Sequence, residues 1–123
     1  MTSQEKTTAA LNICFSDYQE LLGGMSDSDW DVQSLCPDWN IRGVSVHLSG
    51  LEDLLIGWNP SSPEEWPPFP KMADFEKISL EWTHEELAKN TVNILDNRKR
   101  ELEGLDSKGW DAPCMTPVGP GTY

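Results

Sequence analysis

The stretch that decides the fold runs from Trp30 to His47 and reads WDVQSLCPDWNIRGVSVH. Its first half is a loop, because Pro37 breaks any regular element there. Its second half begins a helix, since Asn40 is a favourable N-cap and apolar residues then recur at helical spacing: Leu48, Leu51, Leu55 and Trp58. His47 therefore lies about two turns into a helix, on or beside its apolar stripe. A histidine in that place is either a satisfied core residue or a metal ligand.

The segments on either side of this stretch also predict helices. A first helix is expected from about Gln4 to Leu22, with this apolar face: Leu11, Cys14, Phe15, Tyr18 and Leu22. A long helix is expected from about Ala73 to Leu105, with a kink or restart at Thr83, which has a capping-box partner in Glu86. Residues 59–70 are proline-rich and are expected to form a surface loop held by their aromatic residues. No alternating β pattern is present, and the fold class is therefore predicted to be all-α.

Two short segments resemble each other. Residues 27–31 read DSDWD and precede Cys36, and residues 106–111 read DSKGWD and precede Cys114. Each follows a predicted helix, so the pattern indicates two helix–loop–helix units, the second without its last helix. A chance similarity between two loops rich in Asp, Ser and Trp is the alternative.

The motif around the first of these loops resembles a known family. It comprises Trp30, the run 34–39 (SLCPDW), Asn40, Arg42 and the run 47–50 (HLSG). This spacing is similar to the N-terminal metal-binding region of the DinB-like, mycothiol-dependent maleylpyruvate isomerase family. Trp110–Asp111 and residues 116–123 match more loosely. One departure is Gly43, where family members usually carry an acidic residue.

The resemblance implies a fold and a metal site. Residues 1–123 would form a single, partial domain: three helices of an up-down DinB-like four-helix bundle, with the last helix missing. His47 would be a ligand of a divalent metal, with zinc as the expected ion, and the missing helix would carry the remaining ligands. We expect the His47 side chain to face the bundle interior. Neither a catalytic nor a cofactor-binding residue can be assigned.

Other candidate residues are set aside. Glu52 and Asp53 do not share a helical face with His47 at i+3 or i+4, so they are not expected as co-ligands. His84 lies in a first helical turn and is expected to face solvent. Cys36 is expected to pack within its loop rather than to react, and the cysteines include no C-x-x-C pair that would indicate a zinc knuckle.

Three functional hypotheses follow. The first, implied by the resemblance, is the metal-binding domain of a mycothiol-dependent isomerase or S-transferase, in which the metal activates a low-molecular-weight thiol such as mycothiol. The second is a non-enzymatic helical module that binds a partner or a small ligand. The third, a purely structural acidic helical protein, has only composition in its favour.

Composition limits the partners. The net charge of −12, from 21 acidic and 9 basic residues, argues against nucleic acid. The apolar runs are too short to span a membrane, the N-terminus is polar, and a cytoplasmic protein is expected. The expected partners are a small-molecule substrate or thiol. Three amphipathic helices without a fourth would also leave an apolar patch that a homodimer could cover.

Overall fold

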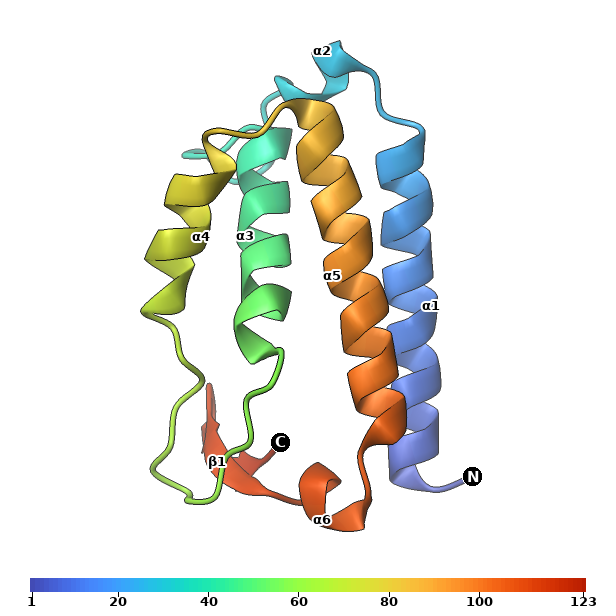
Figure 1. The fold of residues 1–123 in the computed structure, drawn as a ribbon, viewed down its shortest axis with the longest axis vertical. Coiled ribbons are helices and arrows are strands. Elements are labelled where there is room, and N and C mark those ends of the chain that lie inside the picture. Colours follow the sequence, from blue (N-terminus) through green and yellow to red (C-terminus); the bar gives the residue numbers. More distant parts are fainter.

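A computed structural model describes residues 1–123 and shows a mostly helical chain with six helices and one two-stranded sheet (Figure 1). The helices are α1 (Ser3–Gly23), α2 (Asp27–Trp30), α3 (Ile41–Leu55), α4 (Lys71–Ser79), α5 (His84–Gly104) and α6 (Ser107–Trp110). The strands are β1 (Pro113–Thr116) and β2 (Gly119–Thr122). None of the helices is both long and apolar enough to cross a membrane.

The longer helices start at the residues whose side chains cap them. The Asn40 side chain accepts a hydrogen bond from the Gly43 amide at 2.9 Å, and α3 begins at the next residue. The Thr83 hydroxyl accepts one from the Glu86 amide at 3.1 Å. That cap separates α4 from α5, so the expected restart at Thr83 is confirmed. Each such cap stabilises a helix by about 1 kcal/mol.

The long helices lie side by side in the order α4, α3, α5, α1 (Figure 1). Between α1 and α5, one buried cluster is formed by Phe15, Leu95 and Leu102. Near α2, a second cluster is formed by Leu22, Trp30 and Leu87. Burying each of these side chains contributes roughly 1.5–3 kcal/mol. Both clusters contain residues of α5, because α5 lies between α1 and α3.

Two hydroxyl pairs fix the rotation of α3 about its axis. Ser49 and Thr91 on α5 are fully buried, and their hydroxyl oxygens lie 2.8 Å apart. The Ser45 hydroxyl lies 2.5 Å from the Tyr18 hydroxyl on α1. A buried hydroxyl without a partner is costly, so these pairs hold the Ser45–Ser49 side of α3 against α5 and α1.

The hairpin at residues 113–122 was not expected. β1 and β2 are antiparallel, with Pro113 opposite Thr122, so the expectation that the chain contains no strands was wrong. The strands carry little side-chain alternation because two glycines and two prolines lie in them. Contacts from elsewhere stabilise the pairing instead: the Met115 amide donates to the Glu65 carbonyl at 2.8 Å.

Two packing expectations were also wrong. Cys14 is exposed rather than a core residue, because α1 turns Phe15 toward α5 and leaves the adjacent position outside. The rings of Trp66 and Phe69 contact each other at a tilt of 52°, with centroids 6.3 Å apart, yet both remain exposed. The loop of residues 59–70 is held instead by buried Pro60 and by its hydrogen bond to the hairpin.

Candidate functional site

The loop of residues 31–40 is tightly hydrogen-bonded. The carbonyl oxygen of Trp39 accepts from the Ser34 hydroxyl at 2.7 Å and from the Gln33 side-chain amide at 2.8 Å. The Ser34 hydroxyl also accepts from the Cys36 amide at 3.0 Å. A bridge between Gln33 and Asn40 closes the loop at its base. The serine and tryptophan of the sequence motif therefore build one compact turn that leads directly into α3.

His47 is half-buried and packs against Trp39. The two ring centroids are 4.8 Å apart, with an angle of 31° between the planes. The indole reaches His47 by lying over Gly43, where a Cβ atom would come within 3.0 Å of the Trp39 Cβ. Gly43 and His47 are four residues apart and share one face of α3, and Trp39 reaches that face from the loop before the N-cap.

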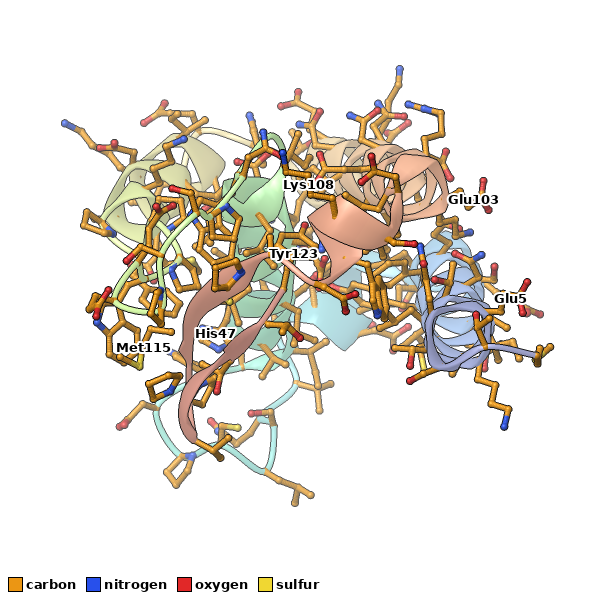
Figure 2. All side chains as sticks on the ribbon, turned by 90° about the horizontal axis from the view of Figure 1, so that it is seen from below. Glu5, His47, Glu103, Lys108, Met115 and Tyr123 are labelled. Atoms are coloured by element: carbon orange, nitrogen blue, oxygen red, sulfur yellow. The ribbon has the colours of Figure 1, made fainter.

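The side of α3 that carries His47 faces away from α5. Ser49 points to α5, and 100° of rotation per residue places His47 about 160° around the helix from Ser49. Figure 2 likewise shows His47 on the side of α3 away from α5. The two serine hydroxyl pairs turn the opposite side of α3 toward α5 and α1, so the expectation that His47 faces the interior of a bundle completed by a further helix stays a prediction.

His47 lines a hollow of about 310 Å³ between the first turns of α3 and the end of α4. Its lining residues are Trp39, Asn40, Arg42, Gly43, Val46, His47, Glu76, Ser79 and Leu80. They offer one imidazole and one carboxylate. Nowhere in residues 1–123 do three or more His, Cys, Asp or Glu side chains gather in a way that could hold a metal ion.

His84 was wrongly expected to face solvent. Its ring stacks on buried Trp30, with centroids 5.5 Å apart and planes within 11°. The Arg42 guanidinium donates to His84 Nδ1 at 2.8 Å. Because arginine only donates, Nδ1 is the acceptor and the neutral ring carries its proton on Nε2, which is 4.0 Å from Asp31. Arg42 also donates to the carbonyls of Ser79 and Trp82, so this contact joins α3 to the α4–α5 connection.

The remaining candidates lie apart from His47. The carboxylate of Glu52 accepts from Arg98 at 2.8 Å, so it is engaged on another side of α3. Burial raises the pKa of Asp53, against the opposing effect of Lys71. Cys36 is exposed rather than packed within its loop. None of the three adds a donor beside the imidazole.

A second group of titratable side chains surrounds Arg98, which is only 5% exposed. Its guanidinium donates to Glu52, to Glu101 at 2.7 Å and to the Tyr123 hydroxyl at 2.7 Å. Burial acts to lower the Arg98 pKa, but its hydrogen bonds to Glu52 and Tyr123 outweigh this and raise it. Burial also raises the pKa of Tyr123, against the opposing effect of Arg98. This group joins α3 and α5 to the end of the hairpin.

An apolar stripe on α3 is only partly buried. It consists of Ile41, Val44, Leu48, Leu51 and Leu55, which alternate at spacings of three and four residues. None of them belongs to either buried cluster, and Leu48 is 45% exposed. On α1, Ile13 and Leu21 are exposed as well. A hollow of about 670 Å³ lies between the two helices near α2, lined by Asp17, Glu20, Leu21, Gly24, Met25, Asp29, Val32 and Ile41.

Comparison with known proteins gives one match. The family model described as the mycothiol maleylpyruvate isomerase N-terminal domain matches residues 12–123. No curated protein and no solved structure matches the chain significantly. The match includes the 31–40 loop, His47, the long helices α3 and α5, and the hairpin.

Proposed function

Because the chain belongs to the mycothiol maleylpyruvate isomerase N-terminal domain family, we propose that it presents His47 as one donor to a divalent metal, zinc. The metal would bind a low-molecular-weight thiol such as mycothiol and favour its thiolate form. The observation that carries this proposal is a half-buried imidazole, held by an aromatic ring at the start of α3. A neutral imidazole is a common zinc ligand.

The donors in the chain do not by themselves fit a tightly held zinc. Catalytic zinc sites use about three protein ligands, and His47 has no such set around it. In this proposal the other donors come from a further helix that packs on the α3 stripe. Leu51 and Val44 of that stripe lie about 40° and 60° around α3 from His47, so a helix seated there would border the imidazole.

An internal repeat supports that helix. After α1 and α2, the Ile41 amide donates to the Val32 carbonyl at 2.8 Å, and α3 begins at Ile41. After α5 and α6, the Tyr123 amide donates to the Ala112 carbonyl at 2.8 Å. Val32 and Ala112 each follow the tryptophan of a one-turn helix by two residues. Tyr123 therefore occupies the position in the second helix–loop–helix unit that Ile41 occupies in the first. In this proposal a helix starting at Tyr123, as α3 starts at Ile41, would complete a DinB-like four-helix bundle.

A site-resolved titration with Zn²⁺ tests the role of His47. The chain has two histidines, so NMR signals of both imidazoles can be followed in one experiment. We expect Zn²⁺ to shift the His47 signals, with weak affinity, while His84 changes little because Arg42 occupies its Nδ1. His47→Ala should remove the response and leave helicity intact.

The control is His84→Asn, which should retain the Zn²⁺ response at His47. Adding mycothiol to the Zn²⁺-treated chain should then produce further shifts at His47 that do not appear without the metal. A Zn²⁺ response that survives His47→Ala would overturn the proposal. If neither Zn²⁺ nor mycothiol affects His47, the non-enzymatic module is the better account, because the partly buried α3 stripe would then serve a partner alone.

A further inference from the structure

We propose that the groove between α1 and α3 receives a basic amphipathic helix. This inference rests on the proposed function only for the presence of a further helix on the α3 stripe, and it makes no use of the metal. The proposed function assigns that helix no charge, whereas the groove that would receive it has a definite chemistry.

The groove has a floor and two walls. Its floor is the pair of hydroxyls that Tyr18 of α1 and Ser45 of α3 bring within 2.5 Å of each other. A rotation of 100° per residue places Leu21 about 60° around α1 from Tyr18, on the side away from the residues that pack against α5. On α3, the same rotation places Leu48 about 60° from Ser45, on the side away from Ser49, which meets α5. Leu21 and Leu48 therefore lie on the two sides of the hydroxyl pair, facing away from α5.

The walls of the groove are apolar and reach solvent. Leu21 is 62% exposed, Val32 54% and Leu48 45%. Leu21 and Val32 line the hollow of about 670 Å³ near α2, and Ile41 belongs to both this hollow and the α3 stripe. From Ile41 to Leu55 the stripe is roughly 20 Å long, which is about four helical turns. An apolar strip of that length matches one face of a helix rather than a small ligand.

The charges that border the hollow are all negative. Asp17 and Glu20 of α1 and Asp29 of α2 line it, and no lysine or arginine does. Asp17 lies about 40° further around α1 than Leu21, so its carboxylate borders the apolar wall. A helix with an apolar face on α3 and basic residues beside α1 would pair with these carboxylates, whereas an acidic helix would be repelled by them.

A second copy of the chain fits the groove less well than such a helix. Each chain carries a net charge of −12, so two copies repel each other. Among the basic residues, Arg98 is buried, and Arg42 and Lys99 already donate to groups within the chain. The occupant that the charges favour is therefore the further helix of the proposed function, with lysine or arginine along the side that faces α1.

Binding of labelled helical peptides to the 123-residue chain tests this inference. The probe is a fluorescein-labelled peptide of about 18 residues, made of leucine, alanine and lysine, with leucine at helical spacing on one face. Its match carries glutamate at every lysine position. We expect the basic peptide to bind, as measured by fluorescence anisotropy, with an affinity that falls as salt is added. The acidic peptide should bind at least about tenfold more weakly.

Two double variants separate the groove from the overall charge. Asp17→Asn with Glu20→Gln neutralises the α1 side of the hollow. Exposed ion pairs each change an affinity about twofold, so this variant should weaken the basic peptide about fivefold. Asp74→Asn with Glu81→Gln removes the same charge from α4 and the residues after it, away from the hollow, and is the matched control.

Leu21→Gln tests the apolar wall without changing the charge. It should weaken the basic peptide at least about threefold, since less apolar surface is buried. Leu80→Gln replaces a leucine that is also exposed but lies just after α4, and it should leave the affinity unchanged.

Several results would overturn the proposal. They are no binding of the basic peptide, equal binding of the two peptides, and equal weakening by the two double variants. A chain that sediments as a dimer, and that the basic peptide dissociates, would instead assign the groove to a second copy. Failure of the proposed function is a separate result, because it is measured by Zn²⁺ at His47 and leaves peptide binding in the groove unaffected.

Discussion

Replacing Arg98 with methionine should destabilise the protein strongly, because the guanidinium is the only cation among Glu52, Glu101 and Tyr123. Breaking a buried ion pair by removing one partner costs about 3–5 kcal/mol. Both carboxylates are about one quarter exposed and keep some hydration. The expected loss therefore lies at the lower end, about 3 kcal/mol, which is a large part of the 5–15 kcal/mol typical of a domain.

Urea unfolding followed by tryptophan fluorescence measures this loss. With a slope of about 1.5 kcal/mol per molar urea, a loss of 3 kcal/mol lowers the midpoint by about 2 M. Arg100 lies two residues further on and is exposed, so Arg100→Met is the matched control and should change stability by less than about 0.5 kcal/mol.

A second substitution tests the cause. If the cost comes from unpaired carboxylates, Glu52→Gln in the Arg98→Met background should recover about 1–2 kcal/mol, since a neutral amide tolerates burial better than a carboxylate. Equal midpoints for Arg98→Met and Arg100→Met would refute the reasoning. So would a double variant no more stable than Arg98→Met alone.

Three further outcomes are expected. Burial raises the pKa values of Cys114 and Tyr123, so the folded state holds these protons more tightly than the unfolded state does. The free energy of unfolding should therefore stay constant below pH of about 9 and fall as pH rises through about 9–11. Unfolding series at about pH 8 and 10.5 measure this, and Tyr123→Phe should lose less stability over the range. Leu48→Lys should lower the fluorescence of a bound hydrophobic dye while stability changes by less than about 0.5 kcal/mol; an unchanged signal would locate the dye elsewhere. Gly50→Ala places a Cβ atom 2.6 Å from the Met72 sulfur. Overpacking should outweigh the gain in helix propensity, so thermal unfolding should show a net loss of about 1–2 kcal/mol. A variant more stable than the original chain would contradict this.

Much of the helical framework could be predicted because local chemistry determines it. Asn40 and Thr83 carry their capping signal within four residues of sequence, and both start helices as expected. The hairpin could not be predicted in this way, because Gly119 and the residues around it lack alternation and their pairing depends on a contact with Glu65, some fifty residues earlier.

The site was predictable only in part. The motif located His47 on a helix, but its orientation depends on the Ser49–Thr91 pair, and no local pattern encodes which residue of α5 will meet α3. His84 was misjudged for the same reason. Its burial comes from Trp30 and Arg42, which lie more than forty residues away in the sequence.

The hydrogen bonds within the 31–40 loop have a consequence for conformational entropy. Ordering one residue costs about 1–2 kcal/mol, and an unconstrained loop would meet that cost again whenever a ligand bound beside it. Here Gln33 and Ser34 already hold the Trp39 carbonyl in the folded chain. The ordering cost is therefore met once, during folding, and a ligand at His47 would bind a surface that is already in place.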